Sequence, residues 1–281
     1  MKTHLHKAVF FLILFLHIIK PSEVFPADYL TASGCSISNT GYLTELANEY
    51  ERRTGIRIYI RGGGSVVGIE DLRSGRVDFA AACRGRSADD PADIQFIQVA
   101  WDALVFIVHK SNPAENISVE SVREIYSGRI TNWKKLKGNN APIKIFLSRP
   151  KKGLSGVEAS IRDMVLKGEN PVETPDTVSV ASTGIVEQMV EDTPAGFATA
   201  GFTSARKRTV KMLKVNGVYP TIKTIINNRY PLKRPLYLLT PKQSKPGVRQ
   251  FVDFVLSREG QRFLGSLGVV SLSAIRQNLR E

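Results

Sequence analysis

Glycine and hydroxyl residues follow a short predicted strand near the amino-terminal third of the chain. Residues 56–60 are rich in β-branched side chains and predict a strand, and 66–72 predict a helix. Between them lie Gly62, Gly63, Gly64 and Ser65. Glycines let the backbone approach a ligand closely, and the first turn of a helix offers free N–H groups to an anion. This junction therefore predicts an anion seat, although Ser65 could equally be a simple helix N-cap.

A second predicted strand follows the same helix and ends at a cysteine and an arginine. Residues 77–81 are apolar and predict a strand, which delivers Cys83 and Arg84 at its carboxyl end. Strand, turn, helix and strand in this order are typical of a βαβ unit, in which ligands bind at the carboxyl ends of parallel strands.

The same kind of junction recurs three more times. A predicted strand at 29–33 leads into Cys35, Ser36 and Ile37, with a helix from about 40 that stops at Gly55. A strand at 143–147 leads to Arg149 and then to a helix that starts at Ser155, Gly156 and Val157, and residues 181–184 precede a helix over 185–190. Recurrence favours a ligand-binding function over four unrelated N-caps.

The order of elements predicts an α/β protein with two lobes. The apolar segment 96–108 is a candidate connection from the first lobe to the second. A strand is predicted at 209–215, and another at 236–239 returns to the first lobe. One long C-terminal helix is predicted from Pro246, with its apolar face against the core.

Composition narrows the function further. The chain has 281 residues, of which 42% are hydrophobic and 23% charged, as expected for a folded protein of one large domain or two lobes. Its formal charge is +13, or +11 without residues 1–27. The basic residues are dispersed, and no aromatic-basic platform accompanies them, so we expect no nucleic-acid partner.

The amino terminus has the plan of a secretory signal peptide. Lys2 and Lys7 precede an apolar run over 8–19, and Ala27 offers a cleavage site. The run is short for a membrane span, so a signal peptide over 1–27 and a periplasmic location are predicted, with a membrane anchor as the alternative.

Cysteine and histidine are scarce. Cys35 and Cys83 are the only cysteines; in an exported protein they form either a disulfide or a reduced, buried pair. Apart from the leader, His109 is the only histidine, which argues against a histidine-rich metal site. A hydrolase with Ser65 as nucleophile would need a G-x-S-x-G elbow, but position 67 is Val67. We therefore predict no catalytic residues, no metal and no cofactor.

Four sequence strings carry a family resemblance. They are GCSIS…LANEYERRTG, GGGSVVGIEDLRSGRVDFAAACR, IYSGRITNW and SGVEASI. Together they resemble the phosphate-binding component of bacterial phosphate ABC importers, over nearly the whole chain after residue 27. The resemblance implies a periplasmic-binding-protein fold of class II type, with an oxyanion cleft between two α/β lobes joined by two hinge strands. It places lobe 1 at 28–104, lobe 2 at 105–234, and a return to lobe 1 with the C-terminal helix at 235–281.

By position, the resemblance also implies a set of ligand-binding residues: Cys35, Ser36, Ile37, Gly64, Ser65, Cys83, Arg84, Arg149, Ser155, Gly156 and Val157. A desolvated anion needs many convergent neutral donors and one or two cations, which helix starts, hydroxyls and Arg149 supply. In the family fold the loops of Cys35 and Cys83 face the same cleft, so a disulfide between them is compatible with the resemblance.

The chain departs from the family pattern at three positions. Val157 stands where a threonine is usual, Glu158 where many relatives have arginine or a neutral residue, and Cys83 where some relatives have an aspartate. The expected function is capture of phosphate or a related oxyanion for delivery to an ABC permease in the inner membrane, without enzymatic activity. The alternative is an oxyanion or redox sensor that signals to a membrane partner.

Overall fold

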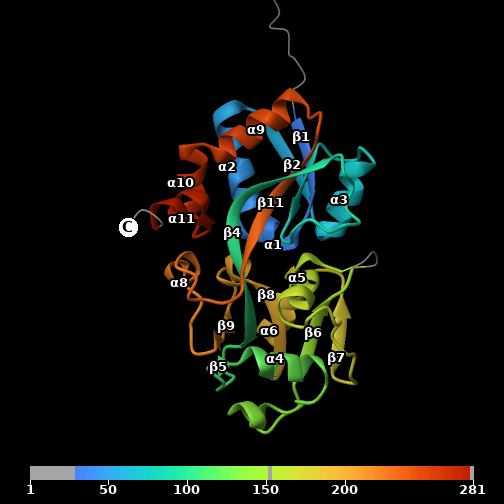
Figure 1. Cartoon of the computed structure of the whole chain (residues 1–281), viewed down its shortest axis with the longest axis vertical. Coiled ribbons are helices and arrows are strands. Elements are labelled where there is room, and N and C mark those ends of the chain that lie inside the picture. Colours follow the sequence, from blue (N-terminus) through green and yellow to red (C-terminus); the bar gives the residue numbers. More distant parts are fainter. Residues whose placement is uncertain (1–28, 151–153, 279–281) are drawn as a thin grey trace, which may run out of the picture.

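The computed structural model describes residues 29–150 and 154–278, so the predicted signal peptide at 1–27 lies outside the described residues. It has two lobes, one above the other in Figure 1. The upper lobe contains β1 (Tyr29–Gly34), α1 (Ser36–Ser38), a π-helical turn (Asn39–Leu43), α2 (Thr44–Thr54), β2 (Arg57–Arg61), α3 (Ser65–Arg73), β3 (Phe79–Ala82), β11 (Lys233–Pro241), α9 (Pro246–Leu256), α10 (Arg258–Ser266), β12 (Val270–Ser271) and α11 (Leu272–Asn278).

The lower lobe is built from the middle of the chain. It contains β5 (Asn116–Ile117), α4 (Val119–Tyr126), a 3-10 turn (Trp133–Leu136), β6 (Lys144–Ser148), α5 (Gly156–Met164), β7 (Thr177–Val180), α6 (Thr183–Asp192), β8 (Gly196–Gly201), α7 (Phe202–Ala205), β9 (Val210–Met212), β10 (Lys214–Val215) and α8 (Ile222–Ile226). The remaining long strand, β4 (Ile94–His109), belongs to both lobes.

Each lobe has its own sheet with a parallel part. In the upper lobe the order is β2-β1-β3-β11-β4, and β1 is parallel to both β2 and β3. In the lower lobe the order is β4-β8-β6-β7, and β6 is parallel to both β7 and β8. Helices that follow parallel strands start at the carboxyl edge of the sheet, so α1, α3 and α5 all start at the junction between the lobes (Figure 1). This arrangement confirms the two-lobed α/β fold.

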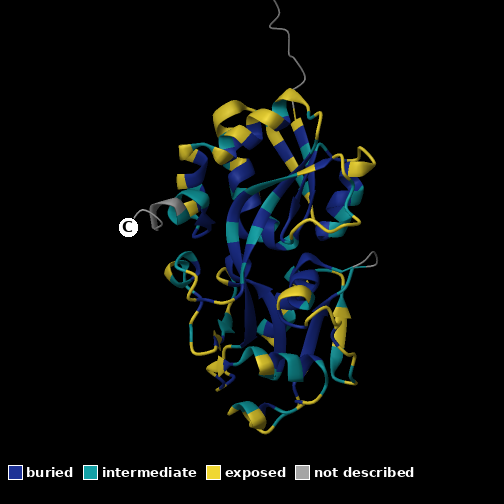
Figure 2. Ribbon diagram, viewed as in Figure 1, coloured by how far each residue is buried: buried dark blue, intermediate teal, exposed yellow. Residues whose placement is uncertain are grey.

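The chain crosses between the lobes at two neighbouring strands. The ladder between β4 and β11 ends at the pair Ala103 and Lys233, and the ladder between β4 and β8 starts at Leu104 and Gly201. β4 thus changes sheets between consecutive residues, while β11 starts at the same level. The buried residues run along β4 from one lobe into the other (Figure 2), so one apolar core spans the crossing.

Two predicted elements are wrong in their extent. The long helix predicted from Pro246 is interrupted at Ser257, whose hydroxyl caps α10 by accepting a hydrogen bond from the Gly260 N–H at 3.1 Å. Serine is a strong N-cap, and it starts a new helix there rather than continuing the old one. The strand predicted at 209–215 is divided into β9 and β10, which pair with different partners, β4 and β5. Among the described residues, no helix is both long and apolar enough to cross a membrane.

A buried ion pair stands at the crossing. Arg234 of β11 is 2% exposed and Asp102 of β4 is 0% exposed, and the Arg234 Nη2 lies 2.9 Å from the Asp102 Oδ2. The Asp102 Oδ1 also accepts hydrogen bonds from the backbone N–H and the hydroxyl of Thr203, each at 2.9 Å. Asp102 therefore ties both crossing strands to the start of α7 in the lower lobe.

Replacing Arg234 with methionine should destabilise the protein by about 3–5 kcal/mol, because Asp102 would be left as a buried charge without its cation. Urea unfolding measures this loss. The control is Arg52→Met, whose ion pair with Glu49 lies at the surface with the arginine side chain 67% exposed, and which should cost less than about 1 kcal/mol. Equal losses in the two variants would show that the pair does not stabilise the crossing.

Candidate functional site

The starts of α1 and α3 are held side by side in the upper lobe. Gly34 has a φ of 132°, and a Cβ there would overlap the backbone carbonyl of Ala81, so only glycine fits. The Cys35 N–H donates to that carbonyl oxygen at 2.9 Å, and the Gly64 N–H donates to the Gly34 carbonyl oxygen at 3.0 Å. Ser65 is fully buried, and its hydroxyl accepts a hydrogen bond from the Cys83 N–H at 3.3 Å. Three separate loops of the sequence therefore form one compact surface.

A disulfide joins two of these loops. Cys35 and Cys83 are bonded, with their Cα atoms 6.1 Å apart. They are 2% and 1% exposed. Of the two states that the sequence left open, the structure thus contains the bonded one. The bridge fixes the N-cap residue of α1 to the end of β3.

The start of α5 in the lower lobe lies directly against this surface. A Cβ built on Gly156 would lie 2.5 Å from the Cys83 Sγ and 2.6 Å from the Ser65 Oγ, which is closer than side-chain atoms approach. The Ser160 hydroxyl lies 3.3 Å from the Cys83 carbonyl oxygen and donates to it. Ser155 caps α5 by accepting from the Glu158 N–H at 3.1 Å. The absence of a side chain on Gly156 thus allows the two lobes to meet.

Nine of the predicted residues come together in this way, on the starts of α1, α3 and α5 and at the end of β3. They are Cys35, Ser36, Ile37, Gly64, Ser65, Cys83, Ser155, Gly156 and Val157. All but Ser36 are buried, and the set combines the backbone N–H groups of three helix starts with the hydroxyls of Ser36, Ser65 and Ser155 and the disulfide.

The two predicted arginines instead turn toward carboxylates of their own lobes. Arg84 forms two hydrogen bonds of 2.7 Å to the carboxylate of Asp90. Arg149 pairs with Glu173 and donates to the Pro171 carbonyl oxygen at 2.9 Å. Neither guanidinium is directed at the α1, α3 and α5 starts in this arrangement.

Glu158 is a carboxyl group that the sequence marked as unusual but did not assign to the site. It lies in the first turn of α5, is 2% exposed, and its Oε1 accepts a hydrogen bond from the Ser148 N–H at 3.3 Å. Its Oε2 has no hydrogen-bond partner among the described residues. Burial raises the pKa of Glu158 to about 7, and the Ser148 N–H and the charge of Arg149 only partly oppose this.

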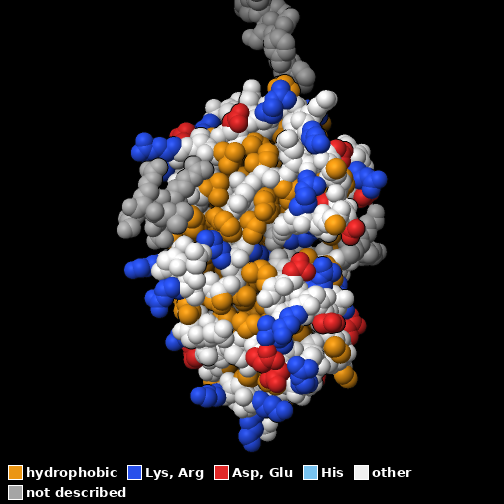
Figure 3. All heavy atoms as spheres, in the orientation of Figure 1, with side chains coloured by type: hydrophobic (Ala, Val, Ile, Leu, Met, Phe, Trp, Pro, Cys, Tyr) orange, Lys and Arg blue, Asp and Glu red, His pale blue; other side chains and the backbone are white. Residues whose placement is uncertain are grey.

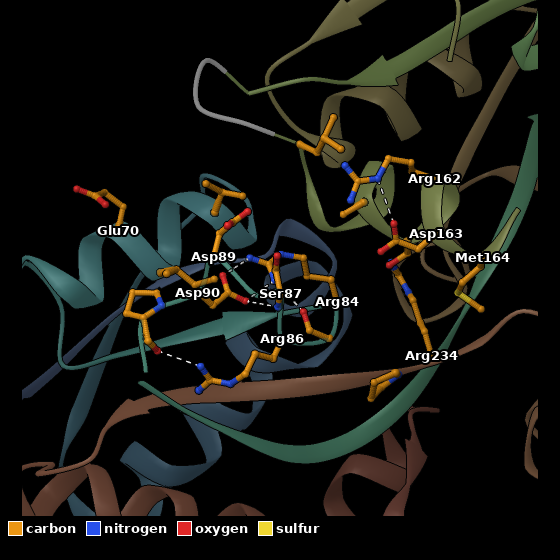
Figure 4. Close-up of a pocket in the computed structure, with 18 of the residues that line it drawn as sticks. Glu70, Arg84, Arg86, Ser87, Asp89, Asp90, Arg162, Asp163, Met164 and Arg234 are labelled. Carbon is orange, nitrogen blue, oxygen red and sulfur yellow. Dashed lines mark hydrogen bonds and ion pairs between the residues drawn. The ribbon is translucent and has the colours of Figure 1, made fainter. Parts of the chain in front are cut away.

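A cavity of about 790 Å³ opens between the lobes beside the helix starts (Figure 4). Arg84, Arg86 and Asp90 line it from the upper lobe, and Arg162 and Asp163 from the lower lobe. It is lined by neighbours of the clustered residues, not by Ser65, Cys83 or Gly156 themselves. The cavity therefore lies next to the cluster, and of its arginines Arg84 and Arg162 pair with carboxylates, Asp90 and Asp163, whereas Arg86 bonds to the Pro91 carbonyl oxygen.

Charge does not gather into a separate patch on the face of the molecule that Figure 3 shows. On the face in Figure 3, lysine and arginine side chains occur on both lobes and are mixed with acidic ones. The residues that the structure describes contain no group of three His, Cys, Asp or Glu side chains placed to hold a metal ion.

Comparison with known proteins decides the family. A model described as a PBP superfamily domain matches residues 22–259, which is most of the chain. The chain belongs to the PBP superfamily.

Several relatives within the superfamily are similar over most of their length. The phosphate-binding protein PstS of Borreliella burgdorferi is 29% identical over 256 residues, covering 87% of this chain and 91% of the relative. The PstS of Bacillus subtilis is 26% identical, covering 83% of this chain and 77% of the relative. A Clostridium perfringens structure described as a putative phosphate ABC transporter substrate-binding protein with bound phosphate has a TM-score of 0.79. It is 25% identical and covers 87% of this chain and 100% of that one.

Residues near the helix starts that the sequence analysis missed share burial and polarity. Ser38 and Tyr42 are buried hydroxyls that follow the start of α1, and Ser160 bridges the lobes. Ser160 lies one turn after the helix start predicted at Ser155 and Gly156, a position that could have indicated it, whereas Ser38 precedes the helix start predicted near 40. Arg234 could not have been found, because its contact with the Gly156 carbonyl oxygen, at 3.4 Å, joins residues 78 positions apart.

We expect the disulfide to stabilise the folded protein measurably. Its two cysteines are 48 residues apart, so replacing both with serine in Cys35→Ser/Cys83→Ser should destabilise the folded protein by about 2–4 kcal/mol. Urea unfolding under non-reducing conditions checks this value.

Thiol titration of the unfolded, unreduced wild-type protein should detect no free thiol, and two free thiols would contradict the bridge.

Proposed function

We propose that this protein is an extracytoplasmic binding protein that captures phosphate, or a closely related oxyanion, between its lobes and delivers it to an ABC importer. The observation that carries the proposal is the meeting of the α1, α3 and α5 starts across the junction of the lobes. The similarity to PstS proteins and to a phosphate-bound binding protein supports phosphate as the ligand. The protein acts by binding and has no enzymatic step.

Helix starts suit a buried oxyanion for a physical reason. The first N–H groups of a helix have no partner within the helix, and they lie at its positive end. Three such ends, with the hydroxyls of Ser65 and Ser155, replace the hydrogen bonds that the anion loses on leaving water. Because two ends belong to one lobe and the third to the other, the anion favours the arrangement in which the lobes meet.

The arginines have distinct proposed roles. Arg149 would leave Glu173 to reach the anion, which is feasible because Glu173 is 61% exposed and a surface ion pair is weak. Arg84 would remain with Asp90, since both groups of that pair are mostly buried, with side chains 12% and 6% exposed.

The proposed partners follow from the same function. The ligand is phosphate or a similar oxyanion, and the receiving partner is the permease of an ABC importer in the inner membrane. The predicted signal peptide supports a periplasmic location.

Calorimetry with phosphate tests the proposal, and Gly156→Ala tests the place of binding. We expect wild-type protein to bind phosphate and Gly156→Ala to bind it about 10- to 100-fold more weakly, because a methyl group there overlaps the Cys83 Sγ and the Ser65 Oγ when the lobes meet. The matched control is Gly62→Ala, since a Cβ at Gly62 meets nothing within 4 Å. No heat from wild-type protein with phosphate, sulfate or arsenate would refute oxyanion binding.

Arg149→Ala distinguishes a ligand-binding arginine from a surface one. If Arg149 moves to the anion, the loss of a charged hydrogen bond should weaken phosphate binding at least tenfold, at about 1.5–3 kcal/mol. The control is Glu173→Gln, which releases Arg149 from its present partner and should not weaken binding. Unchanged affinity in Arg149→Ala would show that Arg149 does not bind the anion and that the helix starts form the site alone.

The disulfide favours one second candidate, a redox-responsive oxyanion sensor that signals to a membrane partner. The bridge lies in the contact between the lobes, so its reduction would release the α1 start from β3. A phosphate affinity of Cys35→Ser/Cys83→Ser that differs more than tenfold from that of the oxidised wild type would support the sensor. Equal affinities would leave the bridge with a purely structural role.

A further inference from the structure

A buried carboxyl group shares the α5 helix start with the proposed anion. Glu158 is the third residue of α5, and its own backbone N–H donates to the Ser155 hydroxyl that caps this helix end. Its side chain accepts a hydrogen bond from the N–H of Ser148, the last residue of β6. It therefore lies at the edge of the sheet that faces the other lobe. The second carboxyl oxygen has no partner among the described residues, although the side chain is almost completely buried.

The groups around Glu158 do not neutralise an ionised carboxylate. Burial, and next the charge of Glu158, raise the pKa of Tyr126 on α4, whose hydroxyl is hydrogen-bonded to the Thr199 hydroxyl at 2.7 Å. Arg149 is the cation that acts on it, but the two terminal nitrogens of its guanidinium bind Glu173 and the Pro171 carbonyl oxygen, while its Nε has no hydrogen-bond partner among the described residues. Glu187, another deeply buried carboxyl group in the lower lobe, has a cation beside it, since its Oε2 lies 3.4 Å from the Arg208 Nε.

A bound oxyanion would add negative charge to the same helix end. Two like charges in a buried region raise one another's affinity for protons, and a single helix end provides only about half a positive charge. If Arg149 also turns to the anion, Glu158 loses part of the remaining opposing charge. A neutral Glu158 removes the repulsion, and its hydroxyl hydrogen becomes available as a donor.

We propose that this protein takes up a proton at Glu158 together with its anion, so that anion capture is coupled to proton capture. The inference rests on the proposed function and identifies Glu158 as the proton-binding site. Its pKa of about 7 before binding means that the coupling acts at ordinary pH, since an anion nearby can only raise this value further.

Calorimetry at pH 8, repeated in two buffers with different heats of ionisation, counts the protons taken up with phosphate. The variant is Glu158→Gln, which keeps an acceptor for the Ser148 N–H but binds no proton. We expect wild-type protein to take up nearly one proton more per phosphate than this variant, and its affinity to fall by up to about tenfold per pH unit above pH 7 relative to the variant. Phosphate's own protonation contributes to both proteins and cancels in the difference.

The matched control is Glu187→Gln, because burial also raises the pKa of Glu187 to about 7. This variant should take up as many protons as the wild type. Equal uptake by wild type and Glu158→Gln, or an equal loss in Glu187→Gln, would overturn the role of Glu158.

Two further outcomes separate this inference from the proposed function. Wild-type protein that does not bind phosphate overturns both, whereas phosphate binding with equal proton counts overturns only the coupling. If Glu158→Gln does not fold, carbon NMR of the wild-type glutamate carboxyls at pH 8 decides. One additional protonated carboxyl on saturation with phosphate supports the proposal, and unchanged carboxyl signals refute it.

Discussion

The tightest steric constraint on the packing of the two lobes is the contact between Gly156, which has no side chain, and the Cys35–Cys83 disulfide. Gly156 at the start of α5 lies where any side chain would overlap the Cys83 Sγ and the Ser65 Oγ. The helix starts on which the proposed function depends can meet only because this residue has no Cβ. The disulfide and the hydrogen bond to Ser65 fix the loops of the upper lobe relative to one another. The lower lobe therefore packs against a rigid surface.

The crossing strands give this contact its geometry. β4 runs through both sheets, so the lobes share one strand and part of one core. Arg234 links this crossing to α5, because it pairs with Asp102 and also reaches the carbonyl oxygen of Gly156. A buried ion pair contributes little net stability compared with apolar packing, but removal of one partner is costly. The pair is thus suited to defining the angle at which the lobes meet.

In this structure the helix starts proposed to hold the anion carry neutral donors, and neither predicted arginine is directed at them. Arg84 is committed to Asp90, and Arg149 lies with Glu173. Backbone N–H groups keep their donors at every pH and do not need a counter-ion when the ligand is absent. Glu158 lies at the same helix start, and burial raises its pKa to about 7, which is why the proposed proton coupling is assigned to it.

Local patterns in the sequence determined the elements and most of the residues at the helix starts. Gly64 and Ser65, Ser155 and Gly156, and the Cys35 loop were all predicted from strand-to-helix junctions, because caps and glycine turns depend on neighbouring residues only. The break at Ser257 was missed, since the apolar face continues from α9 into α10 and hides the cap. The direction of long side chains was decided by tertiary structure alone. Whether Arg149 faces an anion or Glu173, whether Cys35 and Cys83 are bonded, and whether Glu158 is buried with an unpartnered oxygen depend on residues that are distant in sequence. Only the folding of each lobe brings these groups within a few ångströms of their partners, and electrostatic and steric interactions are decided at that range.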